Sequence, residues 1–133
     1  MSTALTVQPL LEVSNDPGRR LISETVHHLS NGSCRRITLI ETLSDAPEAL
    51  RLGDHSHPDH ELFIVRTGTA VLYVAPVNDL TDVTVYHLTA GDTIDIPADV
   101  AHTFLCQPGT VLESHADHEY YDGWIIPNRL EFI

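Results

Sequence analysis

The sequence predicts an all-β fold, a small sandwich or barrel, on three observations. Short stretches rich in β-branched and aromatic residues recur roughly every ten residues, as successive strands do. Glycines and prolines separate these stretches. No stretch has the apolar periodicity of an amphipathic helix. We expect one domain over residues 1–133, because a chain of this length can bury a core without disulfides.

The predicted strands follow one another along the whole chain. In order, the stretches with strand composition are residues 34–41, 61–66, 69–75, 82–88, 93–96, 102–106 and 123–126. Before them, residues 7–28 can hold one or two edge strands, with a turn at residues 16–18. Residues 45–52 can form one helical turn, and residues 128–133 are ambiguous.

Composition excludes several classes of function. The formal net charge of −12 would repel a phosphate backbone, so we expect no nucleic-acid partner. The sequence contains no lysine, which excludes Schiff-base catalysis and covalent pyridoxal attachment. We find neither a signal peptide nor an apolar run that could span a bilayer, and we expect a cytoplasmic protein with no membrane partner.

Two histidines and a glutamate share one parity in a short polar stretch. In a strand, side chains two residues apart point to the same face, so His55 and His57 do so, and Glu61 can join them across a shallow bend. Two imidazoles and a carboxylate suit Zn, Fe, Mn, Co or Ni better than Ca or Mg. The alternative is a polar strand end with surface histidines. His60 has the wrong parity, and we expect it beside the site or exposed.

A second stretch begins at Gly91 and leads to another histidine. Gly91 precedes a short strand, Pro97 ends that strand, and His102 opens an apolar strand with Phe104 and Cys106 on the same face. A histidine in this position is commonly only a satisfied polar group. Its association with the first stretch is what makes it a candidate ligand.

Together the two stretches resemble the cupin superfamily, whose first motif reads G(X)5HXH(X)3–4E(X)6G. His55, His57, Glu61 and Gly68 fit this motif, whereas its leading glycine has no counterpart because Gly53 lies too close to His55. The second motif reads G(X)5PXG(X)2H(X)3N. Its glycine, proline and histidine are matched by Gly91, Pro97 and His102, while Asp99 replaces the second glycine and Cys106 the asparagine.

The resemblance covers residues 53–106 and implies a small single-domain cupin, a jelly-roll (double-stranded β-helix) barrel. It also implies one divalent transition metal (Fe, Mn, Ni or Zn) inside the barrel, bound by the matched His55, His57, Glu61 and His102. Some proteins of this fold bind no metal, usually because a ligand is missing, and here all four are present. Three histidines and one carboxylate would leave coordination positions open for a substrate.

Other side chains can line the mouth of such a barrel. Arg36 and Thr38 share a strand face, and if it points inward Arg36 can bind a substrate carboxylate or phosphate; a solvated arginine is the favoured alternative. Phe104 and Cys106 can also contact a substrate, although Cys106 is better explained as a buried filler. Candidate catalytic groups are Tyr73, for which packing is the simpler role, and His115, His118 and Tyr120. The last three belong to residues 113–124, a segment that can fold over the mouth, form a surface loop or contact a second subunit.

Three functions remain open. The first is a metalloenzyme that acts on a small organic molecule, either an oxygenase or an isomerase, epimerase or lyase. The second is a non-catalytic, metal-dependent binding module for a small molecule. The third is a metal-free sugar-nucleotide isomerase or epimerase, in which the histidines would be bases. Residues 61–66 are apolar on both faces, which predicts burial on both sides by sheet stacking or by a dimer interface, and the resemblance favours a homodimer.

Overall fold

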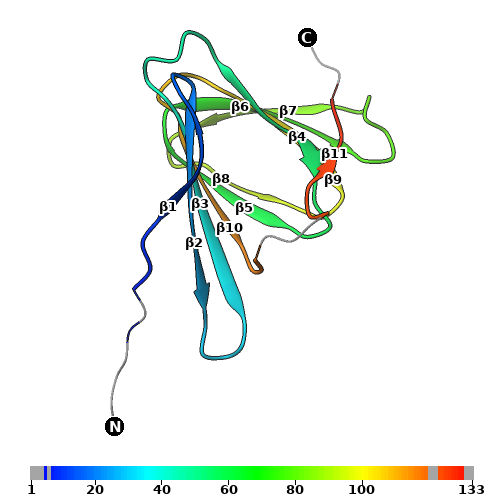
Figure 1. Cartoon of the computed structure of the whole chain (residues 1–133). Helices are drawn as coiled ribbons and strands as arrows, with labels where there is room; N and C mark the ends of the chain where they lie inside the picture. The colour runs from blue at the N-terminus through cyan, green and yellow to red at the C-terminus, as the bar shows by residue number, and fades with distance from the viewer. Residues whose placement is uncertain (1–4, 6, 120–122, 131–133) are drawn as a thin grey trace.

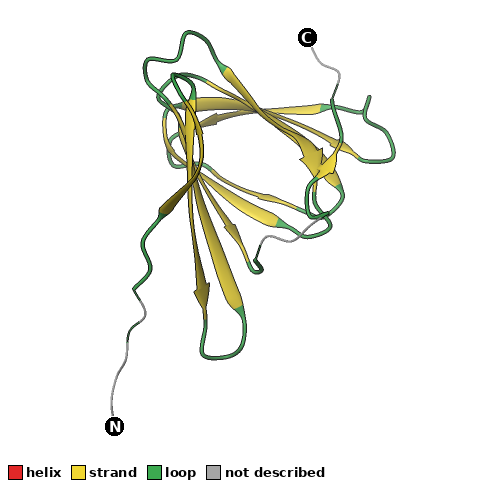
Figure 2. Ribbon diagram, viewed as in Figure 1, coloured by secondary structure: helices red, strands yellow, loops and turns green. Residues whose placement is uncertain are grey.

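The computed structural model describes residues 5, 7–119 and 123–130, and in them the chain forms only strands, turns and loops (Figure 2). The strands are β1 (Leu11–Asp16), β2 (Arg20–His28), β3 (Cys34–Thr42), β4 (Leu50–Ser56), β5 (Glu61–Thr67), β6 (Thr69–Pro76), β7 (Thr84–Thr89), β8 (Thr93–Ile96), β9 (Val100–Cys106), β10 (Val111–Ala116) and β11 (Ile126–Pro127). Over these residues there is no helix of the length and apolarity needed to cross a membrane.

The strands form two antiparallel sheets that face each other (Figure 1). One sheet has the order β1-β2-β3-β10-β5-β8, and the other has the order β11-β4-β9-β6-β7. The pairs β3 with β10 and β4 with β9 join strands that lie far apart in the sequence. This connectivity is that of a jelly roll, so the predicted all-β jelly-roll barrel is confirmed.

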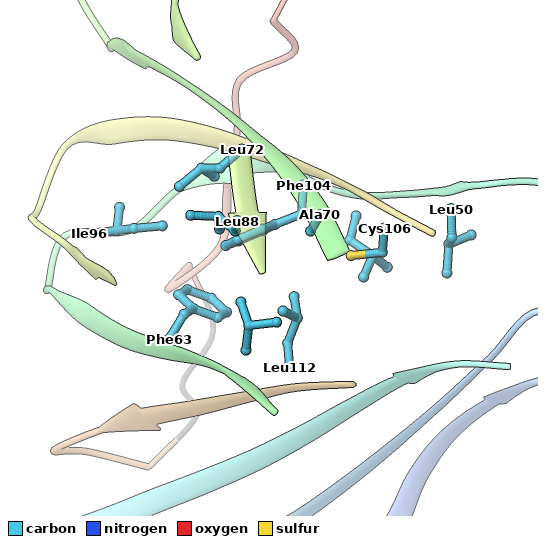
Figure 3. Close-up of a cluster of buried hydrophobic side chains, with 11 residues drawn as sticks. Leu50, Phe63, Ala70, Leu72, Leu88, Ile96, Phe104, Cys106 and Leu112 are labelled. Carbon is cyan, nitrogen blue, oxygen red and sulfur yellow. The ribbon is translucent and has the colours of Figure 1, made fainter. Parts of the chain in front are cut away.

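The core lies between the sheets and follows the two-residue period of the strands. In β9, Phe104 and Cys106 point inward and pair with Leu72 and Ala70 of β6 (Figure 3). From the other sheet, Phe63 packs against Phe104 with ring centroids 4.8 Å apart. This apolar layer fills one end of the barrel, which leaves the other end for polar side chains.

A second, smaller cluster lies on the outer face of the β4–β9–β6 sheet. There Leu130 is buried against Ala75 and Ala101, with Tyr73 packed beside them. The Nη2 of Arg51 donates a 2.9 Å hydrogen bond to the carbonyl of Leu130. These contacts anchor the chain that follows β10 onto the barrel.

Most predicted strands are observed, with ends that differ by one or two residues. The predicted turn at residues 16–18 joins β1 to β2. β2 is not an edge strand, however, because it lies between β1 and β3. The helical turn predicted for residues 45–52 is wrong: Leu50 and Leu52 belong to β4, where they are buried opposite Cys106 and Phe104.

Two further predictions need correction near the end of the chain. The strand predicted at residues 123–126 is reduced to the two-residue β11, because Trp124 packs against a histidine ring instead of joining a sheet. The segment 113–124 begins as strand β10, which no predicted strand covers, and its remaining described residues, 117–119, 123 and 124, lie outside strands.

Within this chain, residues 61–66 are covered on one face only, and burial of the other face by a dimer interface stays a prediction. Phe63 and Val65 of β5 point into the core, whereas Leu62 on the outer face is 36% exposed. No second sheet covers this outer face among the described residues. Sheet stacking is therefore not the reason for the apolar outer residues.

Candidate metal centre

A β-bulge in β4 turns His55 towards the interior. Before the bulge, Leu50 and Leu52 point inward, and a regular strand would then place the even-numbered residue 54 inside. The register with β9 shifts between Gly53 and His55, so that His55 lies opposite His102. The extra residue reverses the facing of the side chains that follow it.

The bulge is held by its own residues. Asp54 has a left-handed φ of 61°, and its carboxylate accepts hydrogen bonds of 2.7 and 2.6 Å from Arg51 and one of 2.8 Å from Thr103. The hydrogen bond from Arg51, with smaller contributions from Thr103 and from nearby cationic charge, lowers the pKa of Asp54 against the opposing effect of burial. Asp54 therefore remains ionised and connects the bulge to the neighbouring strand.

His57 follows the end of β4 and is almost fully buried. Its Nδ1 lies 3.0 Å from the carbonyl oxygen of Trp124, and its ring stacks on the indole at 3.7 Å with an interplanar angle of 13°. A carbonyl oxygen can only accept, so we assign the ring hydrogen to Nδ1. The lone pair of Nε2 then points into the barrel.

His102 has the same arrangement. It lies in β9, fully buried, and its Nδ1 is 3.1 Å from the carbonyl oxygen of Val100. The hydrogen is again on Nδ1, which leaves Nε2 as an acceptor. The Nε2 atoms of His57 and His102 are both buried, and neither has a hydrogen-bond partner in the part of the chain that the structure describes.

The three histidines converge. One ring nitrogen from each of His55, His57 and His102 lies within 4.8 Å of the others, and their ring centroids are 4.6 to 5.1 Å apart. Burial, helped by the neighbouring histidines, lowers the pKa of His55 to about 3 and that of His102 to about 4. Both rings are therefore neutral at physiological pH, which is the form that binds metal ions.

Glu61 opens β5 and borders this cluster. It is buried, and its Oε1 lies 3.3 Å from Nε2 of His57. Burial acts to raise the pKa of Glu61, but the adjacent His57 ring, the Ser114 hydroxyl and His102 hold it below its usual range. A carboxylate oxygen and an imidazole lone pair at this distance repel each other unless a cation, either a proton or a metal ion, lies between them.

These residues fit a transition-metal ion. The donor set is three imidazole nitrogens with one adjacent carboxylate, which suits Zn, Fe, Mn or Ni. The backbone carbonyls that bind Nδ1 of two rings supply the outer hydrogen bonds that usually orient metal-binding histidines.

A cavity of about 180 Å³ opens beside the cluster. His55, His57 and Glu61 line one side, and Arg36 and Thr38 of β3 line the other. Four larger hollows, of about 340, 330, 250 and 220 Å³, contain none of the three clustered histidines. The candidate ligands His55, His57 and Glu61 therefore border a smaller cavity.

The structure separates the predicted substrate-binding residues into two groups. Arg36 and Thr38 line the cavity, so the favoured expectation of a solvated Arg36 is wrong: only 2% of its surface is exposed. Its guanidinium carbon lies 4.1 Å from the ring of Trp124. Phe104 and Cys106 instead belong to the apolar core (Figure 3), where burial raises the pKa of the Cys106 thiol to about 12.

The three described candidate catalytic groups, Tyr73, His115 and His118, lie outside the cavity lining. Tyr73 packs in the outer cluster with Leu130. His115 lies opposite Leu62 on the outer face of its sheet and pairs with Glu113. His118 contacts the edge of Trp124, with ring centroids 5.3 Å apart, so the loop after β10 does reach the neighbourhood of the site. Tyr120 lies outside the described residues.

Three residues at the site were not singled out from the sequence. Trp124, the single tryptophan, supplies the carbonyl and the ring that contact His57. Glu24 of β2 also lines the cavity and accepts a 3.2 Å hydrogen bond from Thr38. Ser114 of β10 borders it beside Glu61. No local motif marks these residues, because each reaches the cavity only through strand pairing or loop packing.

Comparison with known proteins agrees with this architecture. A family model described as the cupin domain matches residues 42–110, which is half of the chain. The capsular polysaccharide assembling protein CapF of Staphylococcus aureus superposes on 93% of this chain with a TM-score of 0.69 and 18% identity. A single-residue variant of Bacillus subtilis oxalate decarboxylase superposes on 93% with a TM-score of 0.68 and 13% identity.

A third solved structure, the formate complex of Lactobacillus farciminis oxalate decarboxylase, covers 93% of this chain with a TM-score of 0.67 and 13% identity. The chain spans only 33 to 37% of the length of these three proteins. At such identities the likeness concerns the fold. No curated protein sequence matches the chain.

Proposed function

This chain belongs to the cupin family, and from that premise we propose that it is a metal-dependent enzyme that acts on a small organic molecule held inside the barrel. The proposed ligands are His55, His57, Glu61 and His102, and the proposed ion is one of Fe, Mn, Ni or Zn.

One observation carries this proposal. At His57 and His102, a backbone carbonyl accepts the Nδ1 hydrogen, so both Nε2 lone pairs are buried and directed into the same space as His55. A buried acceptor without a donor costs free energy, commonly about 1–3 kcal/mol. A cation bound by these atoms would remove that cost.

A bound divalent metal supplies Lewis acidity: it polarises a carbonyl or lowers the pKa of water. The chain contributes the surroundings. Phe63 and the core behind it exclude water from one side, Trp124 holds the His57 ring in place, and Glu24 and Thr38 offer polar contacts to a substrate.

The reaction class is open between an oxygenase and an isomerase, epimerase or lyase. The similar solved structures include a decarboxylase and a polysaccharide assembling protein, so their names do not select one chemistry. A non-catalytic metal-dependent binding module would use the same four residues. The metal-free sugar-nucleotide alternative would use the histidines as bases, and metal analysis separates it from the other two.

We would measure the metal content of the protein, purified without a histidine tag, by elemental analysis. The wild type is expected to hold about one equivalent of a transition metal per chain. His57→Ala should lose most of it, because it removes one ligand. His60→Ala is the matched control: its side chain is 58% exposed and bonded to Asp95, so its metal content should equal that of the wild type.

The identity of the metal directs the next assay. Iron would favour oxygen chemistry, while zinc, nickel or manganese would leave the isomerase, lyase and binding-module functions in competition. Absence of metal from the wild type, even after reconstitution, would contradict the proposal. Equal loss from both histidine variants would also contradict it, because the effect would not be specific to the cluster.

A further inference from the structure

We infer that Arg36 forms a subsite for the carboxylate of a small, singly charged substrate, beside the three histidines. This inference rests on the proposed function, because it places the rest of that substrate at the metal ligands. It names the class of molecule that the cavity takes, namely a small organic acid. Four features of Arg36 support it: its burial, its lack of an acidic partner among the described residues, its contact with Trp124 and its position.

Arg36 is buried in a way that its neighbour is not. Both Arg35 and Arg36 lie in β3, but alternate residues of a strand face opposite sides of a sheet. Arg36 faces inward with 2% exposure, whereas Arg35 is on the exposed outer face. A fully buried arginine is rare unless an anion compensates its charge.

No carboxylate of the described residues compensates Arg36. The ion pairs in that part of the chain use Arg19, Arg51, Arg66 and Arg129, and none of them uses Arg36. The cavity contains two carboxylates, but neither forms an ion pair with Arg36: Glu61 lies 3.3 Å from Nε2 of His57, and Glu24 accepts a hydrogen bond from Thr38. An uncompensated buried charge destabilises the folded protein, so a bound anion would be stabilising.

The stacking leaves the guanidinium able to bind. Its central carbon lies 4.1 Å from the indole ring of Trp124. Stacking uses the face of a planar guanidinium and leaves its N–H groups free to donate in the plane, in the fork that fits a carboxylate with two parallel hydrogen bonds.

The position links this cation to the histidine cluster. The indole of Trp124 contacts both Arg36 and the ring of His57, at 4.1 and 3.7 Å. Arg36, His55 and His57 line the same cavity. A carboxylate at Arg36 would therefore hold the remainder of a small molecule against the imidazoles of His55 and His57.

The charge of the cavity selects a carboxylate over a phosphate. Arg36 is the one lysine or arginine side chain among the described residues that line it, and Glu24 and Glu61 line it too. With a divalent ion bound, Arg36, the ion and the two carboxylates would leave a net charge of about one positive, which a monoanion balances and a phosphate dianion exceeds. The volume of about 180 Å³ admits only a few heavy atoms beyond the carboxylate.

The test compares two probes of equal size on the metal-loaded protein by calorimetry. Glycolate carries the carboxylate and glycolamide replaces it with a neutral amide, so glycolate should bind and glycolamide should bind at least about tenfold more weakly. Arg36→Met keeps the stem that packs on Trp124 and removes the charge; it should weaken glycolate about tenfold or more. Arg35→Met, on the opposite face, should bind glycolate as the wild type does.

The metal content and thermal midpoint of Arg36→Met are measured in parallel. The metal content should be retained, and the midpoint should be retained or raised, since the variant removes a buried charge that has no carboxylate partner among the described residues. If this variant does not fold, Arg36→Lys decides: it keeps the charge but loses the planar fork, and its affinity for glycolate should be lower than that of the wild type.

Several results would overturn the inference: no binding of glycolate at millimolar concentration, equal binding of both probes, unchanged affinity in the Arg36 variants, or inorganic phosphate bound more tightly than glycolate. These outcomes are distinct from failure of the proposed function. A wild type that holds no metal but binds glycolate through Arg36 would refute the metalloenzyme and keep the subsite. A wild type that holds metal, and whose affinity for glycolate is unchanged by substitution of Arg36, would refute the subsite and keep the metalloenzyme.

Discussion

At His57 and His102, a backbone carbonyl decides which ring nitrogen carries the hydrogen. Because Nδ1 donates to Trp124 in one case and to Val100 in the other, both Nε2 atoms are acceptors in a buried space. His55 completes the group with a ring whose pKa is lowered to about 3 by burial. Contacts of His57 and His102 with the main chain, together with the burial of His55, thus direct three imidazole rings to one point.

This neutrality predicts how the metal-free protein responds to acid. The unfolded chain takes up protons at His55 and His102 below about pH 6.5, whereas the folded chain does so only near pH 3 and 4. The unfolded state therefore binds more protons between these values, and the free energy of unfolding should fall as the pH drops from 6.5 towards 4. Urea denaturation of the chelated protein at several pH values measures this slope.

His102→Gln provides the control for that slope. It removes one of the two protonation differences, so the dependence of stability on pH between about 6.5 and 5 should be shallower than in the wild type. The exposed His60 changes the free energy of unfolding in the opposite direction as the pH falls, because its hydrogen bond to Asp95 raises its pKa. Its exposure makes this contribution small. A wild-type stability that is flat or rises as the pH falls through this range would contradict the assignment of buried neutral rings.

Among the elements, β4 has the largest influence on the site. It begins as a core strand with Leu50 and Leu52 inside, and it ends with His55 inside because of the bulge at Gly53. Gly53 has a φ of 102°, and a Cβ built there would lie 2.7 Å from the carbonyl oxygen of His102. Only glycine allows β4 and β9 to approach this closely while the strand changes face.

Gly53→Ala should therefore destabilise the fold and impair the metal centre. The matched control is Gly91→Ala, since Gly91 has a similar φ of 96° but nothing within 4 Å of an added Cβ. We expect Gly91→Ala to lower the free energy of unfolding by about 1–2 kcal/mol through its left-handed backbone. Gly53→Ala should cost at least about 1 kcal/mol more because of the contact with His102.

Denaturation curves and metal content measured on both variants test this difference. Gly53→Ala should lose metal because His55 and His102 lie at the clash, while Gly91→Ala should retain it. Equal stability of the two variants, with metal retained in both, would show that the close approach at the bulge is unimportant.

The chain after β10 is a second element that shapes the site. Trp124 contacts His57 and Arg36, and Asn128 donates a 2.7 Å hydrogen bond to the hydroxyl of Ser56 and bonds through its backbone nitrogen to the carbonyl of Asp54. Leu130 is buried against the outside of the barrel. This segment lies beyond the residues that match the cupin model, so it is a feature through which this chain can differ from other cupins.

For the whole molecule, the exposed apolar residues bear on association. Leu62 is 36% exposed on the outer face of the six-stranded sheet. We propose that this face contacts a second copy of the chain in a homodimer. Light scattering should give a mass of twice 14.7 kDa, and Leu62→Glu should shift it towards the monomer.

Val85→Glu is the control for this experiment. Val85 is 44% exposed but lies in β7 of the other sheet, so the charge should leave the dimer intact. A wild-type mass of one chain, or equal dissociation by both substitutions, would contradict a dimer through the β5 face.

Local patterns in the sequence are sufficient to predict the class of the fold and the residue types of the candidate site. The strands and turns are encoded locally, because period-two patterns and glycine or proline breaks act over a few residues. The spacing of His55, His57, Glu61 and His102 also marked a group that the structure brings together. Their role as metal ligands stays a prediction until the ion is measured.

The construction of that site depends on contacts between distant strands. In a regular strand, Leu50 and Leu52 would face one side of the sheet and His55 the other. All three point inward because of the bulge, which depends on pairing with β9, about fifty residues away. The sequence favoured a solvated Arg36, but Trp124, which lies more than eighty residues later, covers it. Burial and charge compensation arise from contacts between distant segments, and no local pattern in the sequence contains them.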